Sequence, residues 1–296
     1  MKKSICVMLT IVLLAGIFAG CGGGDKIVIA SKQFTENILL SEIYAQLIEK
    51  KTDIKVERKQ NLGGTLVCFP ALDKGEVDMY FEYSGTAYNE IFKMSGSGDL
   101  GAEEIFKRVV DSFDSKNDIT MFSSIGINNT FAIAMKRSKA AELGVSAISD
   151  LSNIDGLRFG CGHLFYDREL DGYAPMVELY DLNFADVVRM DISLLYDAVD
   201  MGQVDVIVVY ATDSLLKKYD MVLLEDDKSL FPVYQGAPII RNAVLEKYPE
   251  LYDILDLLKD RISDERMQEL NYEVDVNGKT PGVVAGEFIA QEGLLD

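Results

Sequence analysis

The sequence holds few of the residues and motifs that enzymes use for catalysis. His163 is the only histidine, and the chain has no Gly-x-Ser-x-Gly nucleophile elbow, no Walker loop and no paired metal-ligand spacing. The turn from Leu62 to Thr65 is too generic to indicate a phosphate-binding loop. We therefore expect a protein that is not an enzyme, with no cofactor and no metal; a surface hydrolase with His163 as its base is a remaining alternative.

Basic residues are also scarce. The chain has 29 lysine and arginine residues against 48 aspartate and glutamate residues, a formal net charge of −19 at pH 7, and losing Lys2 and Lys3 with a signal peptide would take it to −21. Such a surface repels phosphate backbones and anionic lipid headgroups, which argues against nucleic acid as a partner. It mildly favours cationic solutes, although solubility alone is enough to explain it.

Long apolar runs are absent beyond the amino terminus. Two lysines precede one apolar run from Ile5 to Phe18, which is short for a membrane span and is followed by two small residues and Cys21. This pattern is typical of a lipoprotein signal. We expect residues 1–20 to be removed, Cys21 to carry lipid and residues 21–25 to form a tether, so that a soluble extracytoplasmic protein is held at the cell membrane only by that lipid.

Cysteine contributes little to the remaining chain. Of the four cysteines, Cys6 leaves with the signal and Cys21 takes lipid, so that Cys68 and Cys161 remain in an oxidising compartment. They fall in different halves of the chain, and a disulfide between them would tie these halves together. We favour two free, mostly buried thiols.

One pattern occurs twice. The thirteen residues from Ala71 to Tyr83 recur 127 positions later, from Ala198 to Tyr210, with Ala, Asp, Gly, Val, Asp and Tyr in the same places. Each copy predicts a helix that ends at the repeated glycine, followed by a short apolar strand with a tyrosine at its carboxyl end. In open α/β sheets ligands bind beyond the carboxyl ends of the strands, so both tyrosines would face one shared cleft. A chance match between two α/β segments is the alternative.

The elements predicted around the two copies follow the same order. In the first half they are a strand at Lys26–Ala30, a helix at Glu36–Lys50 with Thr35 as its N-cap, a strand at Asp53–Arg58, a helix to Lys74 and the repeat strand. In the second half they are a strand at Leu157–Gly160, a helix at Gly172–Tyr180, a strand at Val187–Asp191, a helix at Ser193–Met201 and a strand at Val204–Tyr210. This order indicates two mostly parallel α/β lobes.

Two segments are candidates for the connections between the lobes. Asn128-Asn129-Thr130 precedes an apolar strand at Phe131–Met135, and the segment Phe231–Pro238 breaks any regular pattern. Helical patterns after Ala243 should return to the first lobe. The predicted division is residues 26–128 and 236–296 in lobe 1 and residues 129–235 in lobe 2, with a cleft between them.

Aromatic residues mark the places where such a fold would expose side chains to the cleft. Tyr83 and Tyr210 end strands, Phe131 follows the first crossing, and Tyr234 lies inside the second. Four ring faces with few fixed cations nearby suit a quaternary ammonium group, whose diffuse charge is poorly hydrated. Core packing of these rings is one alternative. A receptor for an amino acid or a polyamine is another, although a tight polyamine site would need carboxylates in the cleft.

Seven segments resemble those of the substrate-binding lipoproteins of osmoprotectant ABC importers, which take up glycine betaine, carnitine, choline and related solutes. They are Ser31–Glu36, Leu62–Thr65, Glu82–Tyr88, Asn128–Ala132, Phe165–Arg168, Tyr210–Asp213 and Leu224–Asp227. The resemblance runs from about Lys26 to the carboxyl terminus. It implies an α/β, two-lobed periplasmic-binding-protein fold (type II, Venus-flytrap) with two crossing strands. It also implies a small quaternary ammonium ligand and an ABC permease as partners, and we expect a monomer.

The resemblance also implies which residues bind. The family holds the trimethylammonium head in a cage of four tyrosines from both lobes, which match Tyr83, Tyr210, Tyr234 and, with loss of the hydroxyl, Phe131.

Two further residues correspond to family contacts with the polar tail of the ligand. These are Gln33 and Thr65, which lie at or just before a helix amino terminus, where N–H groups favour a carboxylate.

Three features receive structural interpretations. Phe165–Arg168 is interpreted as a turn at the lip of the cleft with Asp167 and Arg168 paired, and Asp213 as part of a helix N-cap. Pro70 should kink the helix before the first repeat strand or shift its start.

Overall fold

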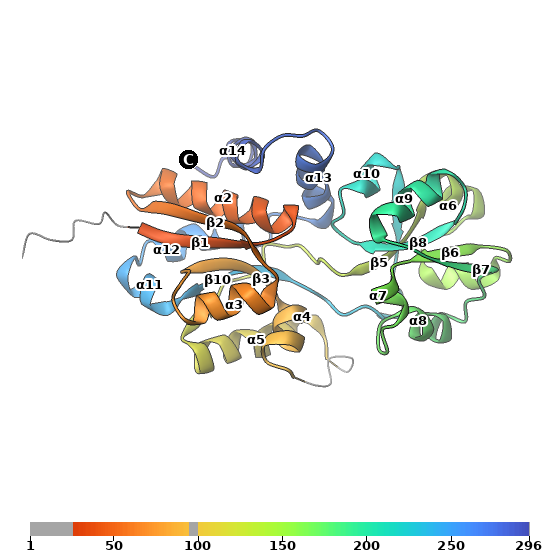
Figure 1. Cartoon of the computed structure of the whole chain (residues 1–296), viewed down its shortest axis with the longest axis horizontal. Coiled ribbons are helices and arrows are strands. Elements are labelled where there is room, and N and C mark those ends of the chain that lie inside the picture. The colour runs from red at the N-terminus through yellow and green to blue at the C-terminus, as the bar shows by residue number, and fades with distance from the viewer. Residues whose placement is uncertain (1–25, 95–99, 296) are drawn as a thin grey trace, which may run out of the picture.

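The structure, a computed structural model, describes residues 26–94 and 100–295. The predicted signal peptide, the lipidated Cys21 and the tether lie outside these residues. Two five-stranded mixed sheets form two lobes that lie side by side (Figure 1). This confirms the predicted two-lobed α/β class.

The first lobe is built on a sheet with strand order β2-β1-β3-β10-β4. Its strands are β1 (Lys26–Lys32), β2 (Lys55–Gly63), β3 (Met79–Tyr83), β4 (Ile119–Met121) and β10 (Gly236–Arg241). Its helices are α2 (Thr35–Lys51), α3 (Thr65–Asp73), α4 (Ser84–Thr86), η1 (Ala87–Ile91), α5 (Ala102–Asn117), α11 (Asn242–Lys247), α12 (Leu251–Leu255), η4 (Asp256–Leu258), α13 (Asp264–Asp275) and α14 (Pro281–Gln291). The carboxyl-terminal helices thus return to lobe 1, and α14 packs along α2.

The second lobe repeats this arrangement with strand order β7-β6-β8-β5-β9. Its strands are β5 (Phe131–Lys136), β6 (Arg158–Cys161), β7 (Asp186–Arg189), β8 (Val206–Tyr210) and β9 (Met221–Leu224). Its helices are α6 (Arg137–Leu143), η3 (Ile148–Asn153), α7 (His163–Tyr166), α8 (Tyr173–Tyr180), α9 (Ile192–Asp200) and α10 (Leu215–Lys218). In both lobes buried apolar clusters cover both faces of the sheet, which is why the inner strands β3, β8 and β10 are almost entirely buried.

The repeated sequence builds the same turn in both lobes. Gly75 and Gly202 have φ of +74° and +66°, a left-handed conformation that glycine adopts without strain. The N–H of the next residue bonds back to the repeated alanine carbonyl at 2.8 Å in each copy. The repeated glycine and alanine therefore specify how each helix ends.

The second repeated aspartate fixes where each repeat strand starts. Asp78 accepts a hydrogen bond from the Val28 N–H at 2.8 Å, and Asp205 accepts one from the Arg158 N–H at 3.0 Å. Val28 lies in β1 and Arg158 in β6, the strands that pair in parallel with the repeat strands β3 and β8, so each aspartate ties the repeat strand to its parallel neighbour. This contact gives a physical reason for the matching sequence.

The two connections between the lobes lie against each other. The first runs from β4 to β5 and the second from β9 to β10. Asn128 and Gln235 form an isolated antiparallel bridge between them, and the Asn128 side-chain oxygen accepts the Tyr234 N–H at 2.7 Å. The two sheets lie on either side of these connections. The division into residues 26–128 and 236–296 for lobe 1 and residues 129–235 for lobe 2 stays a prediction.

Three local expectations were wrong. Thr35 is the first residue of α2, with Phe34 in the cap position, and its hydroxyl donates to Asp275 at 2.6 Å. Gly236 to Pro238 form regular strand, because Pro238 needs only its carbonyl there, which accepts the Phe122 N–H at 3.0 Å. The predicted start of the second-half helix at Gly172 is instead its cap.

Pro70 lies inside α3, which runs from Thr65 to Asp73. A proline in this place leaves the carbonyl of Leu66, four residues earlier, without its helical donor. Leu66 is well exposed, so water can supply the missing hydrogen bond.

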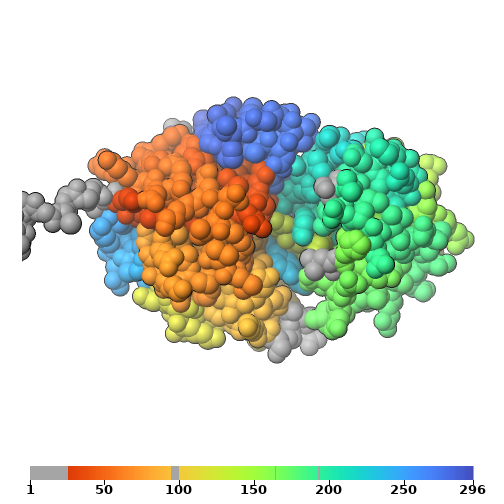
Figure 2. Space-filling view, viewed as in Figure 1, coloured from red at the N-terminus to blue at the C-terminus, as the bar shows by residue number. Residues whose placement is uncertain are grey.

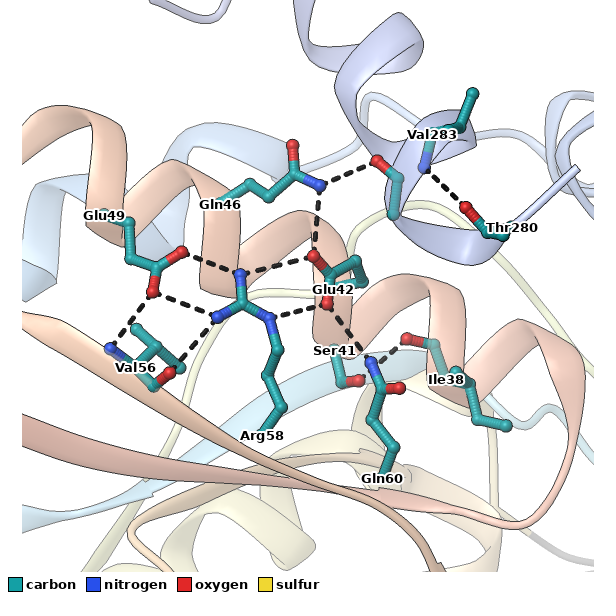
Figure 3. A network of polar contacts seen from close by, with 11 residues as sticks. Ile38, Ser41, Glu42, Gln46, Glu49, Val56, Arg58, Gln60, Thr280 and Val283 are labelled. Atoms are coloured by element: carbon teal, nitrogen blue, oxygen red, sulfur yellow. Dashed lines mark hydrogen bonds and ion pairs between the residues drawn. The ribbon is translucent and has the colours of Figure 1, made fainter.

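A polar network stiffens the outer face of lobe 1 (Figure 3). Arg58 of β2 binds Glu42 and Glu49 of α2 through nitrogen–oxygen distances of 2.7 to 3.2 Å. Gln46 donates to the Gly282 carbonyl at 2.7 Å. These contacts hold α2, which carries residues of the cavity between the lobes, against β2 and α14.

Across the described ranges, no helix combines the length and the apolar character that a membrane span requires.

Candidate functional site

A cavity of about 590 Å³ lies between the lobes and is lined by residues of both and of the crossings. Figure 2 shows the hollow between the two halves of the molecule. Tyr83, Phe131, Tyr210 and Tyr234 all line it. We call these four residues the aromatic cage. The structure brings together side chains that lie as much as 151 positions apart in the sequence.

Pairing between strands sets the positions of the four rings. Phe131 and Tyr210 are direct neighbours across β5 and β8, and their ring centroids are 5.1 Å apart at an interplanar angle of 22°. Tyr83 faces Gly236 across β3 and β10, and Tyr234 lies just before this pair. Tyr83 and Tyr210 thus each end a strand of their own lobe, Phe131 begins β5, and Tyr234 lies in the second connection.

Gly85 makes room for the Tyr234 ring. A Cβ at this position would lie 2.6 Å from the ring carbon Cδ1 of Tyr234. Any larger residue at position 85 would move the ring, so the glycine that follows Tyr83 by two residues belongs to the construction of the cavity.

Gln33 and Thr65 do not line the cavity that the four cage residues line. Gln33 is exposed, and Thr65 is buried with its hydroxyl donating to Glu82 at 3.0 Å. Of the described residues, those that line the cavity include Lys32 and Phe34 on either side of Gln33, but neither Gln33 nor Thr65. Contact of these two side chains with a ligand stays a prediction.

Glu36 places a buried carboxylate in the cavity wall. It lies in the first turn of α2 and only 3% of it is exposed. Its Oε1 accepts hydrogen bonds from the Tyr83 hydroxyl at 2.6 Å and the Asn129 amide at 3.0 Å, and Oε2 accepts a longer one from Asn271 at 3.4 Å. Burial raises the pKa of this carboxyl above its usual value, and the hydrogen bonds partly oppose the shift.

The two cations in the cavity wall each have a carboxylate partner. Lys32 Nζ pairs with the fully buried Glu82 and lies 5.0 Å from the ring centroid of Tyr83. The Arg168 guanidinium binds Asp171 through two nitrogens, at 2.5 and 2.6 Å, and lies 5.2 Å from the ring centroid of Phe131.

The predicted pairing of Arg168 with Asp167 was wrong. Asp167 ends α7, whereas Asp171, three residues after Arg168, presents its carboxylate side-on to the guanidinium. Arg168 is therefore a residue of the cavity as well as of the turn.

Two further carboxylates line the cavity from opposite sides. Asp213, three residues after the repeat tyrosine of lobe 2, accepts the N–H of Leu215, the first residue of α10, at 2.9 Å, whereas the cap residue of this helix is Ser214. Burial raises the pKa of Asp213. Asp275 of α13 accepts the hydroxyls of Thr35, at 2.6 Å, and Ser214, at 2.9 Å, and thereby joins the two lobes.

Sequence reasoning gave no binding role to several cavity residues. Glu36, Asn129, Arg168 and Asp213 lie in segments that carried the family resemblance, so their motifs were the available signal. Asn271 and Asp275 come from the carboxyl-terminal helix α13, where no motif marked them.

The two cysteines and the histidine that the sequence offered as reactive groups do not line this cavity. Cys68 and Cys161 are free and buried, one in each lobe, and burial raises the pKa of both thiols to about 11. His163 is exposed at the start of α7. Within residues 26–94 and 100–295, no group of three or more histidine, cysteine or acidic side chains is arranged to hold a metal ion.

Comparison with known proteins places these observations in context. Residues 25–291 match the model of a family described as the substrate binding domain of ABC-type glycine betaine transport systems. The chain is 33% identical over 305 residues to the carnitine transport binding protein OpuCC of Listeria monocytogenes, with 100% of this chain and 98% of the relative covered. It is 36% identical to a glycine-betaine-binding protein of Pseudomonas aeruginosa, with 99% and 95% covered.

A further relative is about twice as long as this chain. It is the ergothioneine transport permease/ergothioneine binding protein EgtU of Helicobacter pylori, 34% identical over 270 residues that make up 90% of this chain and 48% of the relative. Among solved structures, a glycine betaine/carnitine/choline ABC transporter protein matches with a TM-score of 0.87 at 32% identity, over 91% of this chain and 100% of that one. The expected type II binding-protein fold is thereby confirmed.

Proposed function

Because the chain belongs to the family of substrate-binding domains of ABC-type glycine betaine transport systems, we propose that it captures a quaternary ammonium solute in its aromatic cage and delivers it to an ABC permease. Proteins of this family bind and do not catalyse, which sets aside the hydrolase alternative. The solutes considered are those of the glycine betaine, carnitine and choline type.

The observation that carries this proposal is the convergence of four rings and a buried carboxylate on one cavity. A trimethylammonium group makes no hydrogen bonds, so ring faces can replace its water at small cost. Each desolvated ring contributes about 0.5–2 kcal/mol. Four rings can therefore supply several of the roughly 8 kcal/mol that micromolar affinity requires.

The cations of the cavity wall offer a place for a carboxylate on the ligand. Lys32 and Arg168 lie beside rings of the cage on opposite lobes. A guanidinium can donate hydrogen bonds to a second carboxylate when its first partner occupies only one edge. A zwitterion would then lie with its ammonium head between the rings and its tail toward one of these cations.

Binding would close the lobes on the ligand. Residues of both lobes line the same cavity, so a ligand gains its full set of contacts only when the lobes are together. We further propose that lipid on Cys21 holds the protein at the outer side of the cell membrane, where the permease receives the closed form.

Isothermal titration with glycine betaine, carnitine, choline and proline betaine tests this function. We expect saturable heat from at least one of them, with Kd near the micromolar range or below. Absence of heat from all four, at protein concentrations of about ten times that Kd, would contradict the cage assignment.

The carboxylates in the cavity favour a polyamine as the second candidate. The sequence offered no carboxylate for a tight polyamine site, whereas Glu36, Glu90, Asp213 and Asp275 all line the cavity. A linear diamine such as putrescine distinguishes the two, because its N–H groups need acceptors and gain less from ring faces. Tighter binding of the diamine than of every quaternary ammonium solute would favour this second candidate.

A further inference from the structure

Glu36 is the most deeply buried of the acidic side chains that line the cavity, and its partners at hydrogen-bond distance are all neutral. Its donors are the Tyr83 hydroxyl, the Asn129 and Asn271 amides and the Thr212 side chain. Among the ion pairs of the described residues, Glu36 is absent, whereas Lys32 is taken by Glu82 and Arg168 by Asp171. A carboxylate that is 97% removed from solvent without a cation is costly to keep, so its position calls for a compensating charge.

The position of Glu36 suits a ligand cation. It lies in the cavity lining and its Oε1 holds the hydroxyl of Tyr83, so the carboxylate and a cage ring are fixed in contact. Asn129, from the first crossing, and Asn271, from α13, fix it from two further elements. The first turn of α2 adds a favourable dipole for the ionised form.

We propose that Glu36 is the counter-ion of the bound solute, so that recognition of the positive charge depends on this carboxylate as well as on the rings. The inference rests on the proposed function and specifies that the site recognises the positive charge of the ligand. Glu36 thus determines selectivity for a charged head over a neutral one of the same shape, and its neutral donors hold its oxygens in place.

A pH dependence follows from the raised pKa of Glu36 in the free protein. A cation favours the ionised carboxylate, so binding lowers this pKa and releases a proton wherever the free protein is partly protonated. Affinity should therefore be full above the pKa of the free form and fall as the pH is lowered through it. Other charges that line the cavity are Lys32 on β1, Asp213 before α10, Asp275 on α13, Glu90 on η1 and Arg168 after α7. Asp264 on α13 does not line it but interacts electrostatically with Glu36.

A thermodynamic cycle separates charge from shape. Choline is compared with its neutral carbon analogue, in which a tert-butyl group replaces the trimethylammonium, on the wild type and on Glu36→Gln. The exposed Asp53→Asn, just beyond the other end of α2, controls for net charge. We expect the wild-type preference for choline over the analogue to shrink at least about tenfold in Glu36→Gln and to stay within about twofold in Asp53→Asn.

Titration in buffers of different ionisation enthalpy tests the same inference on the wild type, even if Glu36→Gln does not fold. We expect proton release on binding choline and none on binding the neutral analogue, with choline affinity falling at acid pH. An unchanged preference in folded Glu36→Gln, or equal proton release with both ligands, would overturn the counter-ion role while leaving the proposed function in place. Failure of the wild type to bind any quaternary ammonium solute would instead overturn the function itself.

Discussion

The two strand-end tyrosines come from the same sequence pattern but have different surroundings. Tyr83 is 4% exposed, and its hydroxyl is committed to Glu36. Tyr210 is 37% exposed and stacks on Phe131. The repeat places a tyrosine at the same point of each lobe, but the neighbouring strand and helix decide whether the hydroxyl or the ring face is used.

The origin of this difference lies outside the repeat. Across the sheet Tyr83 faces Gly236, which leaves its ring free to turn toward α2 and Glu36, whereas Tyr210 faces Phe131. Two similar segments thus place one tyrosine of the cavity with its hydroxyl bonded to a buried carboxylate and the other with its ring partly exposed. Substitutions at corresponding positions of the two lobes test this difference.

Tyr83→Ala should have the largest effect on stability. Removal of a fully buried aromatic ring leaves a cavity and deprives Glu36 of its shortest hydrogen bond, so the free energy of unfolding should fall by about 3–5 kcal/mol. Urea denaturation followed by circular dichroism measures it. Tyr83→Phe is the control that keeps the ring, and it should cost about 1.5–3 kcal/mol, the usual contribution of a hydrogen bond to a charged group. A loss below about 1 kcal/mol in Tyr83→Ala would contradict the structural role.

Asp264→Asn tests a contact of the first connection between the lobes, which runs from β4 to β5. Asp264 accepts the Asn128 N–H at 2.7 Å, and burial raises its pKa to about 6 from 3.8. Because the folded state holds this proton more tightly than the unfolded state, stability should fall as the pH rises from about 4 to about 6 and stay low above that.

The asparagine keeps the acceptor and removes the charge. Asp264→Asn should therefore be more stable than the wild type by up to about 2–3 kcal/mol at pH 8 and nearly equal to it near pH 4. Thermal unfolding at the two pH values measures the difference. A variant that is less stable than the wild type at pH 8 would show that the charge itself is needed at this crossing.

Tyr210→Ala should weaken binding more than it weakens the fold. Loss of one desolvated ring contact should raise Kd by more than about tenfold, whereas loss of the stack on Phe131 should lower stability by only about 1 kcal/mol. Titration with the best of the quaternary ammonium solutes gives the first value and urea denaturation the second. Unchanged affinity per folded molecule would show that Tyr210 serves only packing.

Gly75→Ala and Gly202→Ala should give the smallest effect. Both glycines have positive φ, so alanine should cost about 1 kcal/mol at either position. At Gly75 the new Cβ would also meet the Arg241 guanidinium at 2.8 Å and disturb its pair with Asp78, whereas nothing lies within 4 Å at Gly202. Urea denaturation should therefore show the greater loss for Gly75→Ala, and the reverse order would contradict this difference between the lobes.

Much of the fold follows from local sequence. The repeat specified two helix ends and two strands because glycine, alanine and aspartate act within their own turn and on the adjacent strand. The first strand, the long helix α2 and the apolar β5 were predicted within a few residues of their observed bounds. Regular strand at Gly236–Pro238 was missed, because a proline inside a sheet is tolerated only through the particular partners that β3 and β4 supply.

The sequence alone determined a duplicated α/β chain, with aromatic residues at the ends of its strands and around its two crossings, because each of these features depends on neighbours in the chain. Which charges lie beside those rings depends instead on how distant segments pack together. Glu36 accepts hydrogen bonds from Tyr83, Asn129 and Asn271, which lie up to 235 positions away in the sequence. Arg168 pairs with Asp171 and not with the adjacent Asp167. Electrostatic partners are set by distance and burial in space, which local patterns do not encode.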